Sequence, residues 1–173
     1  MNIPSTTHYD WVNQAEISRY ERRLSNPLLF KLFLLTKLPL GWFASMRLEE
    51  VSPSVGVVSL PYGWRTQNPF QSIYFAAQCM AGELCSGIMA MMAVRLAPAP
   101  VSVLLVDLNV EYTKKATSRT WFRCEDGAAI FEAVDKTLTT GQAATVTVRS
   151  VGTMADGTIV SRFELTWSFK KRA

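Results

Sequence analysis

The spacing of apolar residues at the start of the chain predicts helices. Residues 9–24 carry mixed charges at helical spacing and predict a helix exposed to solvent. Asn26 followed by Pro27 is typical of a helix start, with Asn26 as the N-cap and Pro27 in the first turn. This second helix should run to about Lys37, because Pro39 disfavours helical backbone in the residue before it.

The pattern then changes to that of strands. Residues 46–50 and 55–58 predict two strands, and Ser52-Pro53-Ser54 between them predicts a hairpin turn. We therefore expect two units, a helical extension over residues 1–43 and a main domain over residues 44–173.

One long helix is expected in the middle of the main domain. Residues 72–94 contain no proline and are rich in Ala, Met and Leu. Because this segment is apolar nearly all round, it predicts a buried helix. The prolines of Ala97-Pro98-Ala99-Pro100 end it.

Strands dominate the remainder of the chain. They are expected at 101–113, 118–125, 143–151 and 159–169, with a turn through Asp156-Gly157 before the last one. Residues 127–138 fit either a short helix or a strand with a bulge. One long apolar helix followed by antiparallel strands indicates the α+β class, with the sheet curled around the helix.

The predicted strand 101–113 has two chemically different faces. Its apolar face is expected to hold Leu104, Val106, Leu108, Val110 and Tyr112. The opposite face holds Asp107, Asn109 and Glu111. The polar face is interpreted as the outer side of the sheet or a subunit interface, and the alternative is that Asp107 or Asn109 reaches a pocket.

Composition excludes several classes of protein. With 49% hydrophobic and 18% charged residues in 173 positions, the chain fits one globular domain and not a disordered protein. The net charge is only +4, and the tight basic runs include Lys114-Lys115 and Lys170-Lys171-Arg172. No basic stripe with interleaved aromatic residues is present, so no nucleic-acid partner is expected.

The cysteines and the single histidine restrict location and chemistry. Three cysteines without a Cys-x-x-Cys pair suggest a reduced, cytoplasmic protein. His8, the only histidine, lies in the N-terminal tail, so no metal site and no Ser-His or Cys-His machinery is expected. No signal peptide is recognised, and residues 28–43 are too short and too interrupted for stable membrane insertion.

One carboxylate stands out within the predicted central helix. Glu83 is the only charged residue between Arg65 and Arg95. Its neighbours at helical spacing are small or apolar, so this face is expected to form the floor of a slot. A lone buried carboxylate is costly and often marks a functional site. The alternative is that Glu83 faces solvent or pairs with Arg119 or Arg123.

Two segments carry a resemblance to a known family. The first is Asn68-Pro-Phe-Gln-Ser-Ile-Tyr-Phe-Ala-Ala-Gln-Cys-Met-Ala-Gly-Glu83, and the second is Val106-Asp-Leu-Asn-Val-Glu-Tyr-Thr-Lys-Lys-Ala116. With them, residues 44–170 resemble the hotdog-fold thioesterase superfamily. The resemblance is to its phenylacetyl-CoA thioesterase-like branch, and most closely to relatives filed as a domain of unknown function. The family has Asn and an acidic residue fifteen positions apart, as Asn68 and Glu83 are.

The resemblance implies a hotdog fold and an acyl-thioester site. It implies a homodimer or tetramer with the acyl chain in a slot between helices and a neighbouring subunit. The N–H groups near Phe75 and Ala76 would polarise the thioester carbonyl, and Glu83 would activate or orient water. Coenzyme A would enter only as part of the substrate, with no separate cofactor. The candidate substrate-binding residues are Lys114, Lys115, Arg119 and Asn109.

The chain departs from the family pattern at the start of the helix. Gln71 replaces the family Gly, Tyr74 replaces its His, and Phe75-Ala76 replace Gly-Gly. Tyr74 could supply a phenolic donor in place of the His, so the candidate catalytic residues are Glu83, Asn68 and Tyr74. Two functions stay open: an acyl-CoA hydrolase, and a non-catalytic binder or sensor of acyl thioesters or another hydrophobic ligand. A dehydratase generally needs a catalytic histidine, which the domain lacks.

Overall fold

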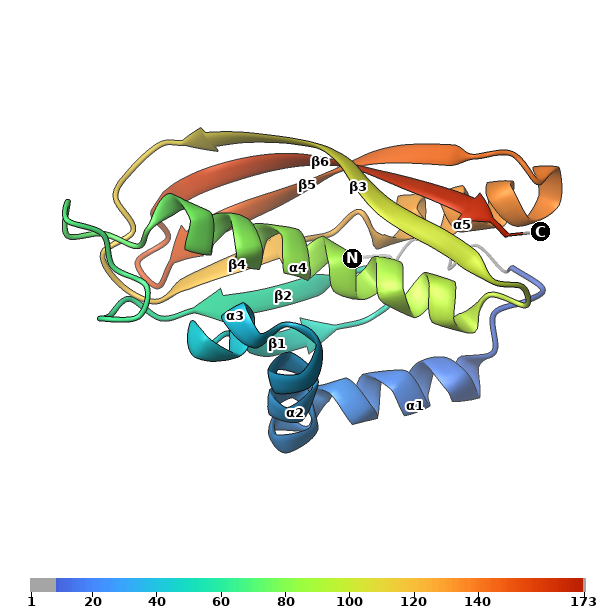
Figure 1. The fold of residues 1–173 in the computed structure, drawn as a ribbon, viewed down its shortest axis with the longest axis horizontal. Coiled ribbons are helices and arrows are strands. Elements are labelled where there is room, and N and C mark those ends of the chain that lie inside the picture. Colours follow the sequence, from blue (N-terminus) through green and yellow to red (C-terminus); the bar gives the residue numbers. More distant parts are fainter. Residues whose placement is uncertain (1–8, 173) are drawn as a thin grey trace.

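A computed structural model describes residues 9–172 of the chain (Figure 1). The helices are α1 (Gln14–Ser25), α2 (Pro27–Lys37), α3 (Pro39–Phe43), α4 (Phe75–Leu96) and α5 (Gly127–Thr140). The strands are β1 (Arg47–Val51), β2 (Gly56–Leu60), β3 (Val101–Tyr112), β4 (Thr120–Cys124), β5 (Ala144–Met154) and β6 (Ile159–Lys171).

The strands form one antiparallel sheet in the order β1-β2-β4-β5-β6-β3. The sheet curls around α4, and α1 and α2 lie beside the β1 end of the sheet (Figure 1). This arrangement confirms the predicted α+β class with one long central helix. The boundary predicted between residues 43 and 44 stays a prediction.

Local signals explain the N-terminal helices. The Asn13 side chain accepts a hydrogen bond from the Ala15 backbone N–H at the start of α1. The Asn26 side chain accepts from the N–H groups of Leu28 and Leu29 at the start of α2. Both asparagines satisfy donors that a helix leaves without an internal partner, and the predicted Asn26 cap is confirmed.

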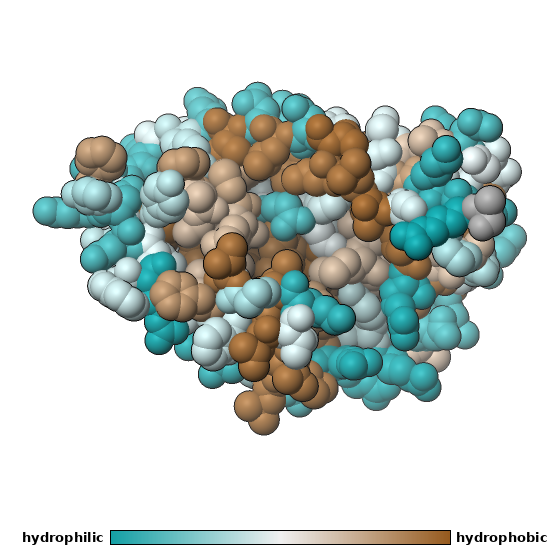
Figure 2. Space-filling view, viewed as in Figure 1, coloured by the Kyte–Doolittle hydropathy of each residue, from teal (hydrophilic) through white to brown (hydrophobic). Residues whose placement is uncertain are grey.

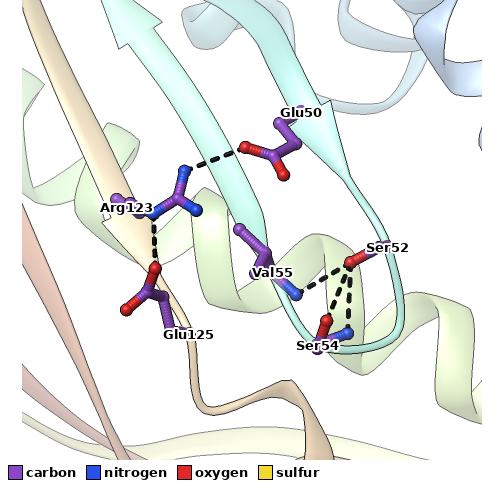
Figure 3. Close-up of polar contacts among 6 residues, drawn as sticks. All are labelled: Glu50, Ser52, Ser54, Val55, Arg123 and Glu125. Carbon is purple, nitrogen blue, oxygen red and sulfur yellow. Dashed lines mark hydrogen bonds and ion pairs between the residues drawn. The ribbon is translucent and has the colours of Figure 1, made fainter. Parts of the chain in front are cut away.

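The first hairpin is closed by side chains as well as by strand pairing. The Ser52 hydroxyl accepts from the backbone N–H groups of Ser54 and Val55 inside the turn (Figure 3). On the neighbouring strands, Arg123 forms ion pairs with Glu50 and Glu125 (Figure 3). The arginine therefore links β1 to β4 across the intervening β2.

Helix α4 is the core of the domain. By length and composition it could cross a membrane, but about two-thirds of its most apolar stretch is buried, as in the core helix of a globular domain. Two glycines allow the sheet to approach it. A Cβ atom at Gly56 of β2 would lie 2.0 Å from the Cys85 carbonyl oxygen, and one at Gly82 would lie 2.9 Å from the Phe163 ring. Glycine is therefore required for contact at both positions.

The segment with two possible structures is a helix. α5 buries Ile130 and Val134 and ends at Gly141, whose backbone is left-handed with φ of 70°. Its apolar residues follow helical spacing, and Gly141 provides the usual stop signal. The alternative of a bulged strand is therefore wrong.

A bulge in β3 corrects the predicted faces of this strand. Leu104 pairs with Ser168, whereas Leu108 pairs with the buried Leu165. The register shifts between Leu105 and Asp107, so the alternation of sides is reset there. The predicted single apolar face from Leu104 to Tyr112 is therefore wrong, because period-two spacing cannot reveal an extra residue.

Candidate functional site

Glu83 lies two turns into α4, beside the segment that connects α2 to α3. It lines a hollow of about 250 Å³ together with Met80, Leu84, Met46 and residues 37–41. Glu83 and Lys37 are the charged residues of this lining; the other residues are apolar, and Gly41 has no side chain. The N-terminal helices therefore supply one wall of the space in front of the carboxylate.

Small residues on α4 allow the Glu83 side chain to lie along the helix. A Cβ atom at Gly87 would lie 2.8 Å from Glu83 Oε1 and 3.5 Å from the Trp167 ring. Trp167 donates its indole N–H to the Ser86 hydroxyl at 3.1 Å, which fixes the ring beside the helix. Gly87 is thus the small residue that leaves room for the carboxylate beside the helix.

The environment of Glu83 favours the neutral acid. Burial raises the pKa of Glu83 from 4.5 to about 7. Within residues 9–172 its carboxylate has no hydrogen bond or ion pair to compensate for the lost water. The two arginines considered as partners are engaged elsewhere: Arg119 donates to Ser59, and Arg123 pairs with Glu50 and Glu125.

The N-terminus of α4 presents unused backbone donors. Tyr74 is the N-cap but makes no side-chain cap, and its own N–H donates to the Thr66 carbonyl. The N–H groups of Phe75 and Ala76 have no acceptor among the described residues. The hydroxyl of Tyr112 donates to the Phe75 carbonyl and contacts Cys79, which ties β3 to this end of the helix.

Asn68 organises the loop before α4. Its side-chain oxygen accepts from the N–H groups of Phe70 and Ser72 and from the Ser72 hydroxyl. This loop also holds Gln71 at φ of 60°, in the left-handed region that favours glycine. A glycine would adopt this conformation without strain, whereas Gln71 adopts it at an energetic cost.

The other candidate residues lie away from Glu83 in this chain. Lys115 donates to the Phe70 carbonyl, and Arg119 donates to Ser59. Lys114 is exposed and lies near Asp156. Asn109 pairs with Glu164, on the side of the sheet opposite the buried β6 residues that contact α4. These four residues are not brought together with the carboxylate.

Sequence reasoning missed two contributions to the site. Leu38 and Leu40 line the hollow at Glu83, although the N-terminal helices gave no sign of this role. Tyr112 was assigned only to an apolar strand face, yet it binds the first turn of α4. Both contacts join segments far apart in the chain, which local patterns cannot reveal.

The described residues offer no set of metal ligands. Across residues 9–172 no group of three or more His, Cys, Asp or Glu side chains could hold a metal ion. Cys79, Cys85 and Cys124 are free thiols, and burial raises the pKa of Cys85 and Cys124. These two cysteines are therefore poor sources of thiolate.

Sequence comparison identifies a family for this chain. Residues 27–169 match the family described as Domain of unknown function (DUF4442). The chain belongs to the DUF4442 family. The match in this DUF4442 protein includes α2 and α3 as well as the sheet and α4. Among curated proteins, no sequence relative matches it.

Solved structures show which fold this DUF4442 protein has. It is similar to a Pseudomonas aeruginosa protein described as a probable thioesterase, with 15% identity, a TM-score of 0.68 and coverage of 87% of this chain and 99% of the other. A Chlorobaculum tepidum protein of unknown function gives 13% identity, a TM-score of 0.70 and coverage of 87% and 99%.

A third similar structure is a Haemophilus influenzae thioesterase, with 12% identity, a TM-score of 0.59 and coverage of 81% and 88%. The DUF4442 protein therefore has the hotdog fold of thioesterase-like proteins, as its sequence predicted. At these identities the similarity describes the fold alone.

Proposed function

We propose that this chain hydrolyses acyl thioesters, with acyl-CoA as the substrate class. The observation that carries the proposal is the raised pKa of Glu83, about 7, at an apolar hollow. A general base is most effective when its pKa lies close to the working pH. The apolar hollow beside the carboxylate suits an acyl chain.

The distance along α4 between its N-terminus and Glu83 determines whether one subunit can form a complete site. Ala76 and Glu83 are seven residues apart, which corresponds to about 10 Å along a helix. A thioester carbonyl held by the N–H groups of Phe75 and Ala76 is therefore out of reach of a water bound to Glu83 of the same helix. Glu83 must act with the helix N-terminus of a second subunit.

The edges of the sheet support pairing through β3. The β1 edge carries Arg47, Glu49 and Glu50, and charges of this kind protect an edge strand. The β3 edge carries Asp107 and Glu111 in its second half, but it also exposes the apolar side chains of Leu104 and Val106. Brown side chains gather along β3 at the top of the molecule (Figure 2). Two antiparallel β3 strands would join the sheets of a homodimer and set the two α4 helices antiparallel, and a tetramer could form from two such dimers.

The reaction needs only water and the thioester. Water attacks the carbonyl carbon while Glu83 accepts its proton, and the N–H groups of Phe75 and Ala76 from the other subunit hold the oxyanion. Collapse of the tetrahedral intermediate breaks the carbon–sulfur bond. The proton on Glu83 then passes to the leaving thiolate, which yields a carboxylic acid and a thiol.

The remaining candidate residues complete this proposal. Lys114 is exposed and free to contact a phosphate of coenzyme A, and Lys115 or Arg119 would have to leave its present partner to do so. Tyr74 is exposed beside the α4 N-terminus and could donate its phenol to the substrate. Asn68 would act by shaping the loop before the helix. The three free cysteines fit a cytoplasmic protein.

The alternative function is binding of acyl thioesters without turnover. It is favoured by the exposed rings of Tyr74 and Phe75, whose centroids are 4.6 Å apart at the helix start. Rings at this position restrict the approach of a carbonyl to the backbone N–H groups. A binder would keep the apolar hollow and lose the oxyanion geometry.

Thiol release from acyl-CoAs of different chain length separates these functions. The wild type should release coenzyme A, and Glu83→Gln should lower kcat by at least about a hundredfold, as loss of a general base does. Glu132→Gln removes an exposed carboxylate on α5 and serves as the matched control. Binding of acyl-CoA without thiol release would favour the binder, and equal activity of the two variants would remove Glu83 from the mechanism.

A further inference from the structure

Helix α2 has a second apolar stripe that the fold leaves exposed. Phe30 and Leu34 are buried against the domain. Leu28, Leu32 and Leu35 follow helical spacing on another side of the helix and are 77%, 55% and 48% exposed. A helix that only covers its own domain needs one apolar stripe, so the second stripe has no partner within the described structure.

The stripe continues into a larger apolar surface. Leu40, Trp42 and Phe43 of α3 are exposed, and Phe43 packs edge-on against the exposed Trp64 with ring centroids 6.3 Å apart. We call the α2–α3 surface the set formed by Leu28, Leu32, Leu35, Leu40, Trp42, Phe43 and Trp64. Brown side chains mark the α2 part of it in the lower half of the molecule (Figure 2).

The charges around this surface are mostly basic, with Glu49 as the acidic residue that lines the same hollow as Leu28 and Lys31. Between residues 22 and 47 the chain has five basic residues and no Asp or Glu. They are Arg22, Arg23, Lys31, Lys37 and Arg47, all of them exposed. Arg65 adds a further cation, 5.9 Å from the Phe43 ring. An occupant of this surface must therefore offer both apolar contact and negative charge.

These properties argue against a second copy of the chain as the occupant. A two-fold contact would place the same mostly basic segment on itself, so like charges would repel each other across the contact. The surface also lies near β1, at the opposite end of the strand order from the exposed β3 edge. Dimerisation through β3 would leave it free.

We propose that the α2–α3 surface docks the protein on an anionic lipid bilayer. The exposed leucines and Trp42 enter the region between head groups and acyl chains, while Lys31 and Lys37 contact lipid phosphates. This combination of an apolar stripe, aromatic rings and cations is what an interfacial helix uses to lie on a membrane. Docking of this kind is peripheral and requires no spanning segment.

Docking would also orient the hollow at Glu83. Leu38 and Leu40 line that hollow, and Leu40 is 69% exposed on the α2–α3 surface. The hollow at Glu83 therefore lies next to side chains that would face the lipid. If the proposed hydrolase function holds, long acyl chains would reach Glu83 from the bilayer; the docking itself does not depend on that function.

Vesicle flotation of the full chain tests the proposal without any substrate. The protein should float with phosphatidylcholine vesicles containing about one-quarter phosphatidylglycerol and stay behind with pure phosphatidylcholine. Leu28→Gln, Leu32→Gln and Leu35→Gln combined should abolish flotation, and thermal unfolding should show that this variant is folded. Lys31→Gln with Lys37→Gln should weaken partitioning roughly thirtyfold, since each cation contributes about 1 kcal/mol.

Two controls keep the outcomes distinct. Lys136→Gln with Lys170→Gln removes two exposed cations from elsewhere and should leave flotation unchanged. Glu83→Gln should float as the wild type does, so a failed hydrolase assay and a failed docking assay are separate results. Absence of flotation, or flotation unaffected by the triple leucine variant, would overturn the proposal. Self-association that the triple variant abolishes would assign the surface to a second copy.

Discussion

The carboxylate of Glu83 lies against Gly87, one helical turn further along α4. A Cβ atom at Gly87 would come within 2.8 Å of Glu83 Oε1. Oε1 is at the end of a flexible side chain. Alanine at position 87 would therefore displace the Glu83 carboxylate while the helix itself stays intact. Gly87 therefore controls where the carboxylate lies.

Gly87→Ala should separate stability from function. Alanine favours a helix over glycine by about 1 kcal/mol, so the free energy of unfolding should be equal or higher. The rate of thiol release should fall at least tenfold, because the carboxylate moves. Gly82→Ala is the matched comparison: its Cβ would meet the Phe163 ring, and overpacking should lower stability by about 1–3 kcal/mol. Full activity in Gly87→Ala would contradict the assigned position of Glu83.

The raised pKa of Glu83 predicts an unusual dependence of stability on pH. Between pH 4.5 and about 7 the folded chain binds more protons at Glu83 than the unfolded chain does. Its contribution to the free energy of unfolding should therefore decrease as pH rises through this window, by at most about 3 kcal/mol. Thermal unfolding of wild type and Glu83→Gln from pH 5 to pH 8 measures this difference.

The glutamine variant should lose that part of the pH dependence and be the more stable protein at pH 8. Glu132→Gln, at an exposed position on α5, should follow the wild type. If the free energies of unfolding of Glu83→Gln and wild type differ by the same amount from pH 5 to pH 8, the pKa of Glu83 is not raised.

Gln71 predicts a contrast between two substitutions at one site. Its φ of 60° suits glycine and is strongly unfavourable for a β-branched residue. Gln71→Gly should therefore raise the free energy of unfolding by up to about 1 kcal/mol, and Gln71→Val should lower it by about 2 kcal/mol or more. Denaturant titration of both variants measures the difference, and equal stabilities would refute the left-handed conformation.

The exposed β3 edge predicts an assembly that charge can disrupt. Leu104→Lys with Val106→Lys should convert a dimer to a monomer in sedimentation experiments and abolish thiol release, since each site would need two subunits. Arg47→Glu alters the opposite edge of the sheet and should leave the mass of the assembly in sedimentation experiments unchanged. A monomeric wild type that is fully active would exclude a site shared between subunits.

The sequence predicted features that depend on neighbouring residues. Asn26 and Pro27 mark the start of α2 because capping is local, and the apolar run of α4 predicts burial by its composition. The importance of Glu83 was visible because it is the one charge in that run. Its alternative partners could not be excluded, since the positions of Arg119 and Arg123 depend on strand pairing.

Other features required the folded chain. The bulge between Leu105 and Asp107 is set by pairing with β6 and leaves no mark on the alternation in β3. The wall formed by Leu38 and Leu40 depends on how α3 returns to α4. The left-handed backbone of Gln71 is set by the folded loop, and the residue type alone does not predict it.

The order of strands affects the protein while the ribosome is still making it. Strand β3 pairs within the sheet only with β6, which begins at Ile159 and is made last among the strands. Until then residues 101–112 have no neighbour in the sheet. The nascent chain therefore carries an unpaired apolar strand during the synthesis of about fifty further residues, at the stage where chaperones act.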